Sequence, residues 1–155
     1  MSAIRQRLNE LGLILPPAPP PPVAAYLPAL GSGGMVFVAG QIPFFNGKLL
    51  ATGPVPSVTS LGAAQHAAAQ CALNALAAAG SVLDGDLDRI RRIVRLGVFV
   101  ASDPDFFDQP KVANGASELL HEVFGEAGRH VRAAVGCIAL PLNASVEVEM
   151  TLEVR

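Results

Sequence analysis

Near its C-terminus the chain alternates strictly between apolar and polar side chains, which is the pattern of a β-strand with one buried face. The apolar set is Val146, Val148, Met150, Leu152 and Val154, and the polar set is Glu147, Glu149, Thr151 and Glu153. An apolar sheet face has to pack against a second layer of structure. The chain therefore folds around a sheet that is covered on at least one side, and its acidic face is left for solvent or another subunit.

The other segments predict two helices packed on one face of a mixed sheet, an α+β fold in a single domain of residues 1–155. A Pro-rich extension, 1–22, precedes the body of the domain. Ser60 is a candidate N-cap and Gly80 a candidate stop for an alanine-rich helix. The predicted helices are 2–11, 60–79 and 106–124, and the predicted strands are 26–30, a run from 35, 88–102, 131–140 and 145–155. The GSGG stretch at 31–34 is expected to be a hairpin turn.

The N-terminal third combines low charge with many prolines. No charged residue occurs from 11 to 47, but the run PPAPPPP at 16–22 excludes a continuous membrane-spanning helix. The first ten residues carry Glu10 and two arginines rather than the pattern of a secretory signal. We therefore expect no membrane partner and a cytoplasmic location.

The composition favours self-association over nucleic-acid binding. Only 15% of residues are charged, against about 25% in a typical soluble domain, and 51% are hydrophobic. Such a chain has little polar surface to cover a monomer, so we expect a homo-oligomer. The net charge is -2, and the arginines at 89, 91, 92 and 95 are spread along a predicted strand. No basic run suited to phosphates is present.

Few residues suggest catalysis by themselves. No nucleophile-elbow, zinc-protease or dinucleotide-binding motif occurs. Cys71 and Cys137 belong to no metal-ligand pattern and are expected to be reduced thiols, so neither metal nor cofactor is predicted. We expect His66 to be a core or interface residue, His121 to be solvated and His130 to be structural.

Arg132 is the exception, because it opens a strand composed otherwise of Ala, Val, Gly, Cys and Ile. Two interpretations are open at this point. The guanidinium could pair with Glu147, Glu149 or Glu153, or extend into water. Alternatively, its planar fork, sheltered by apolar neighbours, could bind the carboxylate of a ligand.

Three segments resemble the Rid family, the reactive intermediate deaminases also known as YjgF-like or endoribonuclease L-PSP proteins. They are MVFVAGQIP from Met35, GDLDRIRRIVRLGVFVASDPDFFDQPKVANG, and RAAVGCIALPLNASVEVEM from Arg132. The resemblance covers nearly all of the chain from Tyr26 onward. It implies a Bacillus chorismate mutase-like fold and a homotrimer with active sites in the clefts between subunits.

The same resemblance implies roles for five residues. Arg132 would hold the substrate carboxylate, Glu147 would lie near the attacking water, and Tyr26 and Asn114 would line the pocket, Asn114 after a one-residue gap. Ala39 stands where many deaminases have a serine. The implied reaction is hydrolysis of 2-imino or enamine acids of the 2-aminoacrylate type to 2-keto acids and ammonia.

Two alternatives follow from the same residues. The missing hydroxyl at Ala39 and the scarcity of acid and base groups favour non-catalytic binding of a keto acid or a related metabolite. The ribonuclease activity in the family's older name is disfavoured, because the chain has no basic groove and no convincing pair of histidines.

Overall fold

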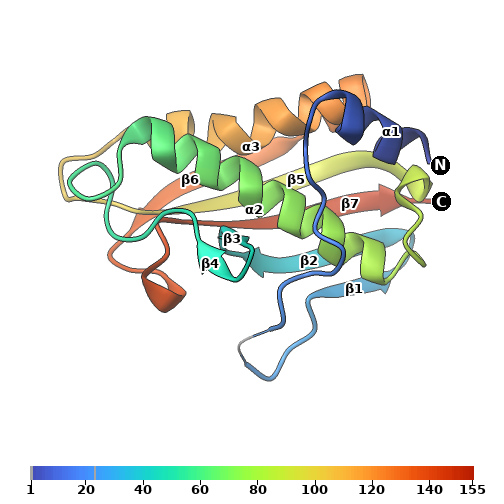
Figure 1. The fold of residues 1–155 in the computed structure, drawn as a ribbon, viewed down its shortest axis with the longest axis horizontal. Helices are drawn as coiled ribbons and strands as arrows, with labels where there is room; N and C mark the ends of the chain where they lie inside the picture. Colours follow the sequence, from blue (N-terminus) through green and yellow to red (C-terminus); the bar gives the residue numbers. More distant parts are fainter. Residues whose placement is uncertain (1, 23) are drawn as a thin grey trace.

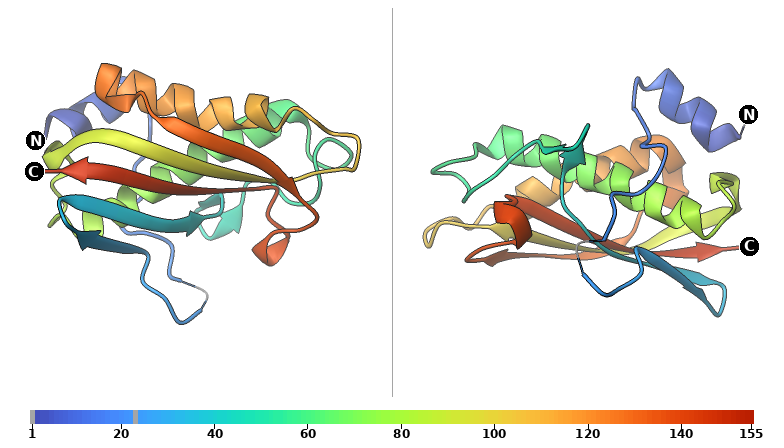
Figure 2. Two further views of the ribbon diagram at one scale, coloured as in Figure 1. Left: turned by 180° about the vertical axis from the view of Figure 1, so that it is seen from behind. Right: turned by 60° about the horizontal axis from the view of Figure 1, so that its bottom comes forward.

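The computed structural model describes residues 2–22 and 24–155 and consists of a sheet with helices on one side (Figure 1). The main sheet contains β1 (Ala29–Ser32), β2 (Met35–Gln41), β5 (Ile90–Ala101), β6 (Val131–Cys137) and β7 (Val146–Val154). The helices are α1 (Ala3–Glu10), α2 (Leu61–Ser81) and α3 (Gln109–Phe124), and a small hairpin consists of β3 (Phe44–Phe45) and β4 (Lys48–Leu49). Helices α2 and α3 lie side by side on one sheet face, as predicted (Figures 1 and 2).

The last two strands are consecutive in the sequence but are not neighbours in the sheet. The strand order is β1-β2-β7-β5-β6, with β7 antiparallel to both β2 and β5 and β6 parallel to β5. Strand β5, helix α3 and strand β6 form a crossover unit, which is the usual way to join parallel strands. As a result β6 lies at one edge of the sheet and β7 at its centre.

The alternating pattern of the last strand is confirmed. Val146, Val148, Met150 and Leu152 are at most 2% exposed and face the helices. Helices α2 and α3 pack closely because α2 is rich in alanine and α3 has a glycine where they meet. A Cβ at Gly115 would overlap the backbone carbonyl of Gln65.

Helix α2 begins as predicted but ends later than Gly80. Ser60 caps it, its Oγ accepting a hydrogen bond from the backbone N–H of Ala63 at 3.1 Å. The helix continues through the buried Gly80 to Ser81. The chain turns away only at Asp84 and Gly85, whose φ angles are +54° and +78°. The prediction that Gly80 stops the helix was therefore wrong, because a glycine ends a helix by adopting positive φ rather than by its presence.

The N-terminal hairpin is shifted toward the GSGG stretch. Strand β1 starts at Ala29 rather than near Tyr26 and includes the first glycine and the serine of that stretch. Only Gly33 and Gly34 form the turn, with φ angles of +58° and +76°. Helix α1 packs on the body through the buried Leu8.

The opposite face of the sheet is not covered by any helix of the described residues (Figure 2). Large apolar side chains are exposed there, among them Phe37 of β2 and Val131 and Val135 of β6. The acidic side chains of β7 are partly paired, Glu149 with Arg95 at 3.2 Å. Within the parts of the chain described, no helix combines the length and hydropathy that crossing a membrane requires.

Candidate active site

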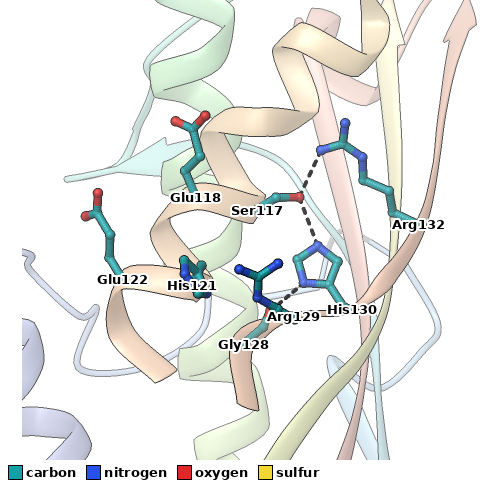
Figure 3. Close-up of a pocket in the computed structure, with 8 residues that line it drawn as sticks. All are labelled: Ser117, Glu118, His121, Glu122, Gly128, Arg129, His130 and Arg132. Atoms are coloured by element: carbon teal, nitrogen blue, oxygen red, sulfur yellow. Dashed lines mark hydrogen bonds between the residues drawn. The ribbon is translucent and has the colours of Figure 1, made fainter. Parts of the chain in front are cut away.

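Arg132 is half-buried on the edge strand β6 and points toward helix α3 (Figure 3). Its strand partner is Leu96, which faces the helices. One terminal nitrogen, Nη1, donates to Ser117 Oγ at 2.9 Å, and the other, Nη2, donates to the backbone carbonyl of Pro110 at 3.0 Å. Both acceptors are neutral oxygens.

No carboxylate among residues 2–22 and 24–155 forms an ion pair with Arg132. Glu149 and Glu153 pair instead with Arg95 and Arg91. The interpretation that Arg132 pairs with Glu147, Glu149 or Glu153 is therefore wrong for a single protomer. A guanidinium has five N–H donors, and the two bonds above leave three, including Nε, for another acceptor.

Arg132 also lines a cavity of about 460 Å³ between β6 and α3 (Figure 3). The other lining residues come from α3 and from the turn before β6: Ser117, Glu118, His121, Glu122, Gly128, Arg129 and His130. Arg132, which forms no ion pair among the described residues, thus lies beside an open space whose lining also includes the exposed carboxylates of Glu118 and Glu122.

Asn114 belongs to the same corner of the molecule. Pro110, Asn114 and Ser117 follow one another on α3 at spacings of four and three residues, which places them along one face of the helix. The first and last of them hold the Arg132 guanidinium. The structure therefore places Asn114 and Arg132 on the same side of the sheet, although Asn114 is not among the residues that line the cavity.

Glu147 lies on the other face of the sheet. Its strand partner is Phe99, three residues beyond Leu96, and an odd separation along a strand puts side chains on opposite faces. With Tyr26, Gly40 and the prolines at 20–22 it lines a small cleft of about 50 Å³. Burial, and then the charge of Glu149, raise the pKa of Glu147 above its ordinary value of 4.5.

The predicted site residues thus form two groups within one protomer. Arg132 and Asn114 lie on the helix-covered side, while Tyr26 and Glu147 share the cleft on the bare side. Ala39 comes directly before Gly40 of that cleft, where the pairing of β2 with β7 is irregular. Its backbone carbonyl accepts a hydrogen bond from the Gln41 side chain at 3.1 Å. One protomer does not place Arg132 and Glu147 around a common substrate.

Gly40 is a site residue that the sequence analysis missed. A Cβ at this position would overlap Oε1 of Glu147, so the carboxylate occupies the space that any other residue would fill. The available signal was a glycine inside a strand, which often marks the close approach of another group.

We expect Gly40→Ala to displace the Glu147 carboxylate and to lower the free energy of unfolding by about 1 to 3 kcal/mol, as overpacking does. Denaturant unfolding measures this change. Gly62→Ala is the matched control, because nothing lies within 4 Å of its Cβ position in helix α2. It should increase stability by about 0.5 to 1 kcal/mol. A Gly40→Ala protein as stable as the wild type would contradict this packing.

Ser117 and His130 are also part of the Arg132 corner. Ser117 Oγ lies 2.9 Å from His130 Nε2, and His130 Nδ1 lies 2.6 Å from the carbonyl of Gly128. Burial lowers the pKa of His130, the hydrogen bond to the Gly128 carbonyl partly opposes this, and the charge of Arg132 lowers the pKa further by a smaller amount. Nothing in the sequence marked Ser117, whereas the structural role predicted for His130 agrees with these hydrogen bonds.

The other candidate residues from the sequence are two histidines and two cysteines. His66 is exposed on α2, on the same outward face of the helix as Gly62 and Ala63. The predicted core position is therefore wrong for the protomer, and the interface position stays a prediction. His121 is exposed, as predicted. Cys71 and Cys137 are free thiols, the first fully buried. In the described part of the chain, no three His, Cys, Asp or Glu side chains are grouped to hold a metal ion.

Comparison with known proteins adds the following matches. Residues 5–154 match the family model described as "YjgF/chorismate mutase-like, putative endoribonuclease". Protein TCP17 of Trypanosoma cruzi is 41% identical over 153 residues, which cover 98% of this chain and 94% of that protein.

Two crystal structures are also similar over nearly their whole length. The protein Atu1372 of Agrobacterium tumefaciens, described as having unknown function, is 47% identical with a TM-score of 0.92, covering 99% of this chain and 93% of that one. A protein of Shewanella oneidensis MR-1 described as a putative endoribonuclease is 33% identical with a TM-score of 0.93, covering 97% and 99%.

Proposed function

This chain belongs to the YjgF/chorismate mutase-like family, and on that premise we propose that it hydrolyses reactive 2-imino acids and their enamine tautomers to 2-keto acids and ammonia. The observation that carries the proposal is the state of Arg132. Its guanidinium is half-buried beside a cavity, is held by two neutral oxygens and has three N–H donors to spare. A half-buried charge loses part of its hydration, and the carboxylate of a substrate would supply a counterion.

In this proposal the reaction needs little more than positioning. The carboxylate binds the Arg132 fork, and Glu147 directs a water molecule at the imine carbon. As the water oxygen bonds to carbon, Glu147 removes a proton from it, and that proton passes to the nitrogen. The hydroxyl proton of the resulting carbinolamine also passes to the nitrogen, and the C–N bond breaks as the C=O bond forms, which releases ammonia and the 2-keto acid. The raised pKa of Glu147 suits it to this role, because a stronger base accepts a proton more readily.

The two groups of residues would meet across a protomer boundary, so we propose that the protein is a homotrimer. Arg132 and Asn114 of one copy would face the Tyr26–Glu147 cleft of the next. Support comes from the position of β6 at the sheet edge and from the exposed Leu30, Phe37, Val131 and Val135. Burial of such side chains is the usual basis of stable self-association. Light scattering should give three times the 16.0 kDa chain mass; a monomer would leave the site incomplete.

The activity is tested with imino acids generated in the assay by an amino-acid oxidase and partly trapped by semicarbazide. The protein should lower the yield of the trapped product and accelerate keto-acid release. An unchanged yield at micromolar protein would contradict the proposal. Binding of 2-ketobutyrate without turnover would favour the alternative, a non-catalytic metabolite-binding protein, which the absence of a hydroxyl at Ala39 supports.

A further inference from the structure

Arg132, Ser117, His130 and Gly128 form one continuous series of hydrogen bonds along the wall of the cavity (Figure 3). The donor at each bond follows from chemistry. Arg132 can only donate, so Ser117 Oγ accepts from it. The carbonyl of Gly128 can only accept, so His130 carries its proton on Nδ1 and donates it there.

The bond between Ser117 and His130 is then fixed as well. In neutral His130, Nε2 is an acceptor, and the Ser117 hydroxyl donates its hydrogen to it. Every member of the series therefore has a partner. The serine hydroxyl is held in one orientation, with its lone pair directed at Nη1 of Arg132. Together with the Pro110 carbonyl at 3.0 Å, this fixes the plane of the guanidinium. When His130 is protonated, Nε2 donates to one lone pair of Ser117 Oγ, the other lone pair still accepts from Nη1 of Arg132, and the serine hydrogen is released for another acceptor.

The charge of Arg132 also acts on His130. The imidazole is half-buried and close to a full positive charge, and both conditions disfavour a second positive charge on the ring. A carboxylate bound to Arg132 would cancel the nearby charge and so remove one of the two causes. The other titratable or charged side chains of the cavity are Glu118, His121, Glu122 and Arg129. All four are exposed, so solvent screens them.

We propose that Ser117 and His130 are positioning residues for the Arg132 fork, and that binding of a carboxylate to this fork is coupled to uptake of a proton by His130. The inference rests on the proposed function, since it takes Arg132 as the carboxylate-binding group. By linkage, whatever favours protonation upon binding also favours binding upon protonation. Affinity for a carboxylate ligand should therefore rise as the pH falls through the titration range of His130.

The coupling can be measured by calorimetric titration of the full-length protein with 2-ketobutyrate in buffers of different ionisation enthalpy. Wild-type protein should take up a fraction of one proton per ligand near pH 6, and His130→Asn should take up none. His121→Asn is the matched control: His121 lines the same cavity, bonded to the carbonyl of Gly125 rather than to Ser117, and the variant should retain the uptake. Ser117→Ala should weaken binding about tenfold, the effect of losing one hydrogen bond to a charged group.

NMR of the wild-type protein keeps the inference testable even if a variant does not fold. The chain has only three histidines, so each ring can be followed. The titration of His130 should move to higher pH when 2-ketobutyrate is added. Binding without this movement, or proton uptake that survives in His130→Asn, would overturn the inference and leave the proposed function intact. Failure of the wild type to bind would instead count against the proposed function.

Discussion

Replacing Arg132 by lysine should lower kcat/KM for an imino acid about 100-fold, the typical cost of misplacing a substrate by roughly 1 Å. Lysine keeps the positive charge but is a single point donor without the planar fork. It cannot bond Ser117 and the Pro110 carbonyl while binding both oxygens of a carboxylate. Steady-state kinetics with an imino acid generated in the assay measure the effect.

The fold should tolerate this substitution. Arg132 is only half-buried at a sheet edge and forms no ion pair within the described residues. Arg129→Lys is the matched control, since Arg129 lines the same cavity but is exposed and bonded to Glu126 at 3.0 Å. It should keep near-native kcat/KM. If Arg132→Lys turned over as fast as the control, recognition by the fork would be wrong.

Glu147→Gln should lower kcat by about 100-fold or more, the usual contribution of a general base, with little change in KM. The amide has nearly the same size and still fills the space over Gly40, so the cleft keeps its shape. It cannot accept a proton from water. A variant with wild-type kcat would show that Glu147 does not act as the base.

Glu147→Gln should lower activity but should not lower stability. Because the pKa of Glu147 is raised in the folded protein, its contribution to stability is fully present below the ordinary value of 4.5. That contribution is lost as the pH rises through the folded-state pKa. At neutral pH the wild type therefore carries a half-buried carboxylate that is repelled by Glu149. Glu147→Gln should be at least as stable there, and denaturant unfolding at two pH values checks this sign.

The rate of the wild type should fall as the pH drops through the raised pKa of Glu147. Glu149 contributes to that shift by repulsion. Glu149→Gln should therefore move the acid limb of the rate profile to lower pH while preserving the maximal rate. If the acid limb of the rate profile did not move, a group other than Glu147 would be responsible for it.

Much of the secondary structure could be predicted because each pattern has a local physical cause. The alternation from Val146 to Val154 and the Ser60 cap of α2 depend only on neighbouring residues, and both predictions are confirmed. The end of α2 was misplaced because the φ angles of Asp84 and Gly85 decide it, and these depend on how the turn packs. The two neighbours of β7 in the sheet, β2 and β5, were not predictable, because periodicity identifies a strand but not the strands beside it.

The candidate site likewise combines residues that the sequence could identify with features that it could not. Arg132 was conspicuous in sequence because a permanent charge among apolar neighbours needs an explanation. Ser117 was not, since a serine on a helix face is ordinary until the guanidinium is placed beside it. The opposite orientations of Arg132 and Glu147 depend on the registers of two strands with β5. Their union in one cleft would in addition require a second copy of the chain, which no pattern within one copy encodes.

The most direct test of the account is a crystal structure of the protein grown with saturating 2-ketobutyrate. The ligand carboxylate should lie within hydrogen-bond distance of the free N–H donors of Arg132, with Ser117 and Pro110 still bonded to the guanidinium. Glu147 of a neighbouring protomer should approach the keto carbon through a water molecule. A ligand bound away from Arg132, or Arg132 neutralised by a carboxylate of an adjacent copy, would contradict the central claim.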